Sequence, residues 1–188
     1  MNSLHYLAIA FGVSELVIAR RKHSRSSAAP SRSHDGGTLR LLQLGITLSI
    51  VGAIVLAATC ELGRFTLSSG AGAVALAVFG SGLALRWWSI VVLGRFFTVD
   101  VAIRDDHVLV TRGPYRYVRH PSYTGLVVAV IGLLTMFGNW LALAGCASLV
   151  VAALVIRIRV EERALAVTFG QRWTSHCSRT WRLLPWLW

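Results

Sequence analysis

Two short groups of polar residues flank one long apolar stretch in the second half of this chain. The first group is Arg119-His120-Pro121-Ser122-Tyr123-Thr124-Gly125, and the second contains Arg157, Glu161 and Glu162. Residues 126–156, which separate the groups, carry no charged side chain. Arginine, histidine and carboxylate groups supply the hydrogen bonds and charge needed to hold a polar ligand or to activate an attacking oxygen. We therefore treat these two groups as the candidate site.

The apolar stretch has the features of a helical hairpin that brings the two groups together. Its arms are residues 123–137 and 140–156, and Gly138-Asn139 forms a tight turn between them. Polar clusters are costly in lipid but tolerable at the end of a membrane span. Since a hairpin returns to the membrane face where it began, both groups should meet there. Arg157 and Glu161 are four residues apart and should share one face of a helix.

Composition places the chain in a membrane. It has 188 residues, of which 55% are hydrophobic and only 14% charged, and its mean hydropathy is +0.61. A soluble domain of this size has no way to bury so much apolar surface. The net charge of +11 does not indicate nucleic-acid binding, because the basic residues lie at the ends of apolar spans. Membrane lipids, including the anionic inner leaflet, are the expected partners.

We predict an all-α, polytopic membrane protein with about five transmembrane helices, the last two forming the hairpin. The three earlier spans are residues 4–19, which is short for a bilayer, and residues 39–60 and 70–93, which are long enough to cross one. The first span contains Glu15 and is followed, not preceded, by positive charge, which favours an uncleaved anchor with its N-terminus outside. Residues 20–38 form a basic loop whose Ser, Ala, Pro and Gly content, from residue 23 on, predicts flexibility.

Basic residues indicate which side of the membrane each segment faces. Of the 19 lysines and arginines, 17 lie in residues 20–40, 94–122 and 157–188. Such asymmetry predicts that these three segments are cytoplasmic. Lys22 is the only lysine beside 18 arginines, which suggests a bacterial source. We therefore expect an inner-membrane protein whose site faces the cytoplasm.

The chain divides into two parts on this basis. Residues 1–93 supply three transmembrane helices, and residues 94–188 form the functional core. That core comprises a cofactor segment at 94–125, the hairpin at 123–156 and a cytoplasmic tail helix within 157–188. Helical character is clearest from Val160 to Phe169, with Gly170 as its C-cap.

Several common catalytic arrangements are missing from the sequence. There is no nucleophile elbow, no glycine-rich nucleotide loop and no metal-ligand spacing among the histidines. Cys60, Cys146 and Cys177 match neither a disulfide framework nor a metal site. An enzyme of this composition must bind its cofactor differently from a soluble dinucleotide-binding protein.

The ordered motifs resemble the isoprenylcysteine carboxyl methyltransferase family. They are His107-Val108-Leu109-Val110, Gly113-Pro114-Tyr115, Arg119-His120-Pro121-Ser122-Tyr123 with Gly125, and then Arg157, Glu161-Glu162 and Phe169-Gly170. The resemblance covers residues 94–188, about half of the chain. It implies a membrane enzyme that uses S-adenosyl-L-methionine to methylate an oxygen of a lipophilic or lipidated acceptor. The family name implies a prenylated C-terminal cysteine, and a bacterial source would favour a phenol or pyrone.

The resemblance also implies roles for individual residues. Arg157 would lie at the acceptor end, as the catalytic residue, and no metal is implied. The residues implied to contact the cofactor are His107, Val108, Leu109, Val110, Tyr115, His120, Pro121, Ser122, Tyr123 and Glu161.

Other interpretations remain open at this stage. Arg119 and Arg157 could extend to lipid headgroups without binding a ligand. His120-Pro121 could serve only to start a helix, and Glu162 is expected to be solvated or paired with Arg159 or Arg163. The alternative functions are an NADPH-dependent membrane reductase with the same His-Pro-Tyr motif, and a non-catalytic membrane scaffold.

Overall fold

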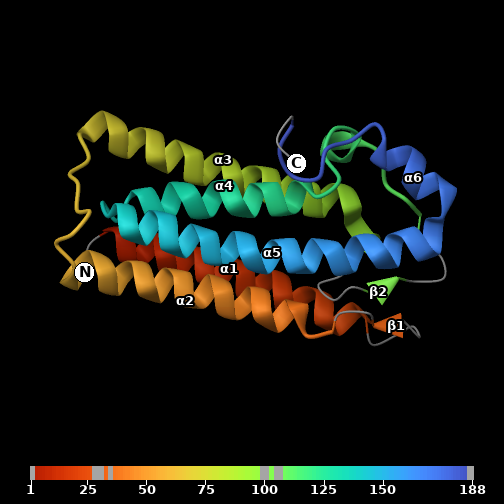
Figure 1. Cartoon of the computed structure of the whole chain (residues 1–188), viewed down its shortest axis with the longest axis horizontal. Coiled ribbons are helices and arrows are strands. Elements are labelled where there is room, and N and C mark those ends of the chain that lie inside the picture. The colour runs from red at the N-terminus through yellow and green to blue at the C-terminus, as the bar shows by residue number, and fades with distance from the viewer. Residues whose placement is uncertain (1–2, 27–31, 34–35, 98–101, 104–107, 186–188) are drawn as a thin grey trace.

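Five long helices run side by side along the longest dimension of the protein (Figure 1). The computed structural model describes residues 3–26, 32–33, 36–97, 102–103 and 108–185. The helices are α1 (Ser3–Ser26), α2 (Thr38–Thr59), α3 (Ser69–Leu93), α4 (Pro121–Thr135), α5 (Trp140–Phe169) and the short α6 (Gln171–Cys177). Two 3₁₀ turns, η1 (Gly94–Phe96) and η2 (Gly113–Arg116), and two strands, β1 (Arg32–Ser33) and β2 (Ala102–Ile103), complete the described elements.

The predicted all-α membrane architecture is confirmed. By length and composition, α2, α5 and the helical segment Ser69–Phe96 are each able to cross a bilayer. The apolar parts of α1 and α4, Tyr6–Ile18 and Pro121–Thr135, are shorter. Large apolar side chains such as Leu44, Val74 and Val91 are exposed on the outside of the bundle. Such a surface is expected where the surrounding medium is lipid.

Helices α3 and α4 approach each other at glycines. A Cβ atom added at Gly82 would lie 2.3 Å from the backbone nitrogen of Ala129, and one added at Gly132 would lie 2.4 Å from that of Phe79. Both distances are too short for any side chain. Close backbone contact of this kind stabilises helix pairs in lipid, where the hydrophobic effect contributes little.

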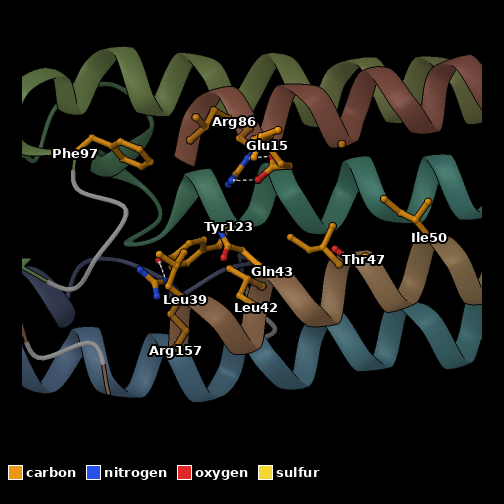
Figure 2. A pocket seen from close by; sticks show the side chains of 14 residues that line it. Glu15, Leu39, Leu42, Gln43, Thr47, Ile50, Arg86, Phe97, Tyr123 and Arg157 are labelled. Carbon is orange, nitrogen blue, oxygen red and sulfur yellow. Dashed lines mark hydrogen bonds and ion pairs between the residues drawn. The ribbon is translucent and has the colours of Figure 1, made fainter. Parts of the chain in front are cut away.

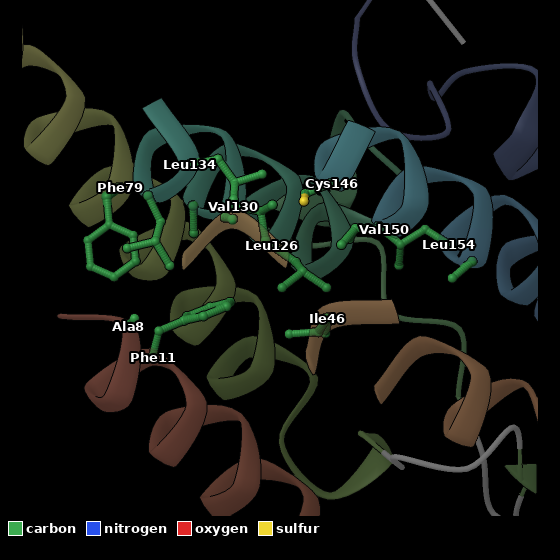
Figure 3. Close-up of a cluster of buried hydrophobic side chains, with 14 of the residues drawn as sticks. Ala8, Phe11, Ile46, Phe79, Leu126, Val130, Leu134, Cys146, Val150 and Leu154 are labelled. Carbon is green, nitrogen blue, oxygen red and sulfur yellow. The ribbon is translucent and has the colours of Figure 1, made fainter. Parts of the chain in front are cut away.

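Side chains from all five long helices contribute to the apolar core (Figure 3). Leu126 of α4 and Leu154 of α5 are fully buried in it. Phe11 of α1 packs edge to face on Phe79 of α3, with ring centroids 6.0 Å apart. The core therefore fixes α4 and α5, which carry the candidate site, relative to the other helices.

The turn between α4 and α5 forms as the sequence predicts. Gly138 has a φ of 65°, a left-handed conformation that glycine adopts easily. The Asn139 side chain caps α5 by accepting hydrogen bonds from the backbone nitrogens of Leu141 and Ala142. Its amide group also donates to the carbonyl of Cys60, which ties the hairpin to the end of α2.

Two predicted boundaries are wrong. The basic loop expected at 20–38 begins later, because α1 continues through Ser26. Within the expected loop, Arg32–Ser33 pairs with Ala102–Ile103 as a short antiparallel ladder. The fifth span and the tail helix, expected to be separate at residue 157, form the single helix α5. Three polar residues after Ile156, Arg157, Glu161 and Glu162, have partners inside the protein and so need not end the helix. It ends at Gly170, where φ is 51°, and α6 follows.

Candidate active site

The first polar group forms the start of α4 and is held by the C-terminal segment. Pro121 occupies the first turn, where its missing N–H leaves no bond unmade. The backbone nitrogens of Arg119 and His120 donate to the carbonyls of Trp181 and Arg182, at 2.7 and 3.1 Å. The hydroxyl of Thr124 donates to the carbonyl of Leu183 at 2.7 Å. The returning chain therefore fixes the orientation of this turn.

Glu162 lies at the centre of a cluster of basic side chains. Its Oε1 atom is 3.2 Å from Nη1 of Arg119 and 3.4 Å from Nε2 of His120. Its Oε2 atom accepts a hydrogen bond of 2.9 Å from Nε of Arg182. The side chain is only 12% exposed. The expectation that Glu162 is solvated or paired with Arg159 or Arg163 is therefore wrong.

The neighbouring Glu161 takes part in a different hydrogen-bonded chain. The hydroxyl of Tyr123 donates to Oε2 of Glu161 at 2.8 Å and accepts from Nε of Arg157 at 2.8 Å. Nη1 of Arg157 also donates to the hydroxyl of Thr38 on α2. Arg157 is 3% exposed, so the interpretation that it extends to lipid headgroups is wrong. Tyr123 thus connects the arginine to the carboxylate.

A cavity of about 290 Å³ lies between the helices beside this chain of hydrogen bonds. Tyr123 and Arg157 stand at its polar end, and apolar side chains of α2, including Leu42, Ile46 and Ile50, form much of its wall (Figure 2). The cavity can therefore hold an apolar group beside a cationic and a phenolic side chain. That combination suits a lipophilic molecule with one polar end.

A buried ion pair also lines the cavity. Nε and Nη2 of Arg86 on α3 contact the two carboxylate oxygens of Glu15 on α1 at 2.6 and 2.5 Å. Nη1 of Arg86 donates to the carbonyl and the hydroxyl of Ser122. Sequence reasoning missed this pair. One acidic and one basic residue, each inside an otherwise apolar span, were the signal that could have revealed it.

The predicted cofactor residues fall into separate places. His120, Pro121, Ser122, Tyr123 and Glu161 lie together with Arg157 at the junction of α4 and α5. The rings of His120 and Tyr123 stack with centroids 5.7 Å apart. His107 lies outside the described residues.

Three of the four other predicted residues lie away from this group. Tyr115 is buried beside it, and its hydroxyl donates to the carbonyl of Ser89 at 3.4 Å. Burial, followed by the negative charge of Glu161, raises the pKa of the Tyr115 phenol well above its usual value, so the hydroxyl keeps its proton. Val108 and Leu109 line a cleft with α6, and Val110 faces the end of α3. None of these three valine and leucine residues contributes to the cavity beside Arg157.

The polar cluster has the chemistry that S-adenosylmethionine requires. The Nε atom of Arg119 is buried and has no hydrogen-bond acceptor within the described part of the chain, so a donor is available for a carboxylate. Glu161 remains 29% exposed and has acceptor capacity for an ammonium or a ribose hydroxyl beyond its bond to Tyr123. Donor and acceptor come from opposite sides of the same junction. The residues present therefore fit the cofactor that the motifs imply.

Comparison with known proteins identifies the relatives of this chain. The model of the isoprenylcysteine carboxyl methyltransferase family matches residues 73–167. Protein-S-isoprenylcysteine O-methyltransferase B of Arabidopsis thaliana is 31% identical over 126 residues, 56% of this chain and 64% of the relative. The Schizosaccharomyces pombe protein-S-isoprenylcysteine O-methyltransferase is 35% identical over 103 residues, 50% of this chain and 41% of the relative.

A solved structure is similar as well. The structure of the eukaryotic intramembrane Ras methyltransferase, an isoprenylcysteine carboxyl methyltransferase, matches with a TM-score of 0.59 and 25% identity over 77% of this chain and 52% of the solved chain. This chain therefore spans only about two fifths to two thirds of the length of these relatives. The matched region contains α4, nearly all of α5 and both polar groups. The chain belongs to the isoprenylcysteine carboxyl methyltransferase family.

Proposed function

We propose that this protein is an S-adenosylmethionine-dependent O-methyltransferase of the membrane, and that it methylates a carboxylate or phenolic oxygen of a lipophilic acceptor. The observation that carries the proposal is the hydrogen-bonded chain from Arg157 through Tyr123 to Glu161. These hydrogen bonds link the apolar cavity between the helices to the polar cluster at the start of α4. One junction therefore has a surface for a lipophilic molecule and a surface for a polar one.

The cofactor would be held on the polar side of the junction. Glu161 would accept hydrogen bonds from its ammonium or ribose hydroxyls, and Arg119 with His120 would bind its carboxylate. Glu162 keeps both of these side chains in place through its contacts at 3.2 and 3.4 Å. When bound, the cofactor supplies a methyl group activated by a sulfonium.

The acceptor would lie in the cavity with its reacting oxygen near Arg157. A guanidinium stabilises an oxygen anion, so Arg157 would keep a carboxylate or phenolate deprotonated and fix its direction. Tyr123 holds Nε of Arg157 at 2.8 Å, which limits the motion of the guanidinium. Direct methyl transfer needs alignment and exclusion of water rather than a covalent enzyme intermediate. A buried arginine next to an apolar cavity would align the reacting oxygen and keep water away from it.

The site would face the cytoplasm. The start of α4, the later part of α5 and α6 lie towards the same end of the bundle as β1 and β2 (Figure 1). Of the 19 basic residues, 17 belong to the three segments assigned to that end. Because positive charge is enriched in cytoplasmic loops, this end would contact the cytoplasm. A soluble cofactor would then arrive from water and the acceptor from lipid.

Direct measurement of methyl transfer tests the proposal. The purified full chain, in detergent or nanodiscs, is supplied with methyl-labelled S-adenosylmethionine and with long-chain acids or alkylphenols. We expect labelled ester or ether that depends on the protein, and less of it from Arg157→Lys. Binding of NADPH without binding of S-adenosylmethionine would instead support the reductase, and binding of neither would support a scaffold.

A further inference from the structure

The cavity beside Arg157 is lined mainly by helices outside the family-matched region. That region begins at residue 73, whereas α1 and α2 both end before it. Ten of the 14 residues that line the cavity belong to α1 and α2, among them Glu15, Leu42, Ile46 and Ile50. Arg157 and Tyr123 come from the matched region. The reacting end of the cavity thus lies within the region that the family model matches, and most of the remaining wall lies before it.

Glu15 is the only acidic residue among those lining residues, and it is firmly oriented. Both of its oxygens are held by Arg86, at 2.6 and 2.5 Å, and Arg86 is fixed in turn by Ser122 at the start of α4. The Glu15 side chain nevertheless keeps 17% exposure. Figure 2 shows Glu15 and Arg86 on one side of Tyr123 and Arg157 on the other. The cavity therefore presents a carboxylate at a fixed distance from the arginine that would hold the reacting oxygen.

The chemistry of this carboxylate defines what it can recognise. An ionised carboxylate has about four acceptor positions, and Arg86 uses two of them. A further hydrogen bond can come only from a donor, because Glu15 repels a second anion. An ion pair buried between apolar helices costs desolvation energy and is seldom better for stability than apolar residues of similar size. Its place in the cavity wall indicates a role in recognition.

We propose that Glu15, oriented by Arg86, selects the acceptor by accepting a hydrogen bond from a donor group that the acceptor carries beside its reacting oxygen. This inference rests on the proposed methyltransferase function. The preferred substrate class is then a lipophilic acid or phenol with a neighbouring hydroxyl or amide N–H. Arg157 holds the oxygen that is methylated, and Glu15 accepts a hydrogen bond from the neighbouring donor group. The apolar tail of the acceptor lies along Ile46 and Ile50 of α2.

A matched pair of acceptors tests the proposal. The full chain in nanodiscs is given labelled S-adenosylmethionine with a long-chain 2-hydroxy acid or with the unsubstituted acid of the same length. The same comparison is made between an alkylcatechol and the matching alkylphenol. We expect kcat/KM for the donor-bearing compound to be at least about tenfold higher. An analogue without the hydroxyl leaves the polar group of the site that would bind this hydroxyl unpaired. A wild-type ratio near one for both pairs overturns the proposal.

A double variant assigns the preference to the ion pair. Glu15→Gln with Arg86→Gln removes both charges together and so avoids an uncompensated buried charge. We expect the preference for the donor-bearing compound to fall close to one. Val13→Ala, a change on the exposed side of α1, should leave the preference as in wild type. A double variant that keeps the full preference overturns the proposal, and the wild-type ratio decides the matter without any variant if the double variant does not fold.

The two proposals fail in different ways. Methyl transfer to both members of a pair at equal rates would contradict the role of Glu15 and leave the methyltransferase function standing. No transfer to any of the four compounds would contradict the proposed function, and the role of Glu15 with it.

Discussion

Replacing Glu162 by glutamine should destabilise the protein more than the same replacement at its neighbour Glu161. Glu162 contacts Arg119, His120 and Arg182 at 2.9–3.4 Å, whereas Glu161 accepts one hydrogen bond, from Tyr123, and lies 3.9 Å from His120. Glutamine keeps the shape of the side chain but removes the negative charge. The contacts of Glu162 join α4, α5 and the C-terminal segment, so their loss should loosen all three.

The size of the effect follows from burial. Removing one partner of a buried ion pair costs about 3–5 kcal/mol. We expect the lower end, about 3 kcal/mol, because Arg182 is 36% exposed and solvent screens its share. For a chain of this length, that corresponds to a fall of about 6–12 °C in Tm. The single bond to the partly exposed Glu161 should contribute about 1 kcal/mol.

Thermal unfolding in one detergent, without cofactor, measures the difference directly. Glu161→Gln is the matched control, since it makes the same chemical change one residue away on the same helix. Equal Tm values for the two variants, or a larger loss for Glu161→Gln, would refute the assignment of Glu162 as the residue that holds the cluster together.

Three further results are expected. Gly82→Ala should lower stability by at least about 2 kcal/mol, because the new methyl group meets the backbone of α4. Gly80→Ala is the control and should leave stability unchanged, since its methyl group meets nothing within 4 Å. Equal Tm values for the two variants would contradict the close packing of α3 on α4. Burial, together with the charges of Arg119 and His120, lowers the pKa of His176 from its usual 6.5, so the unfolded chain takes up a proton more readily than the folded one below that pH. Stability should therefore fall as the pH drops below about 6.5, and His176→Asn should flatten this dependence in thermal unfolding at several pH values; an unchanged pH profile would contradict it. Cysteine labelling in membranes should reach residues 61–69 from outside and the tail only from inside, and an outward-facing tail would contradict the proposed orientation.

The sequence allowed the helices and the meeting of the two polar groups to be predicted, because both depend on local patterns. Apolar length defines the spans, and Gly138-Asn139 turns the hairpin back so that Arg157 returns to the level of Tyr123. The same local reasoning placed Pro121 in the first turn of α4. It wrongly predicted a break at residue 157, because it treated the first charged residue as the end of the span, but the predicted helix end at Phe169, with Gly170 as the C-cap, is confirmed.

The partners of the charged residues were beyond sequence reasoning, since they depend on packing between distant segments. Arg182 reaches Glu162 only because the C-terminal segment lies beside Val118, where Trp181 forms a bridge. Glu15 and Arg86 are 71 residues apart and meet through the packing of α1 on α3. Motif order also grouped Val108 to Val110 with the site, although the chain directs them to clefts near α6 and α3.

In the proposed mechanism, Glu161 binds the cofactor and Arg157 binds the reacting oxygen of the acceptor. The most direct test measures S-adenosylmethionine affinity by calorimetry, and turnover with labelled methyl groups, on Glu161→Gln and Arg157→Lys. Loss of a charge-assisted hydrogen bond in Glu161→Gln should weaken cofactor binding by about ten- to a hundredfold. Arg157→Lys, which loses the planar fork, should bind the cofactor like wild type and transfer methyl groups at least about tenfold more slowly. Wild-type turnover in Arg157→Lys, or wild-type cofactor affinity in Glu161→Gln, would contradict the claim.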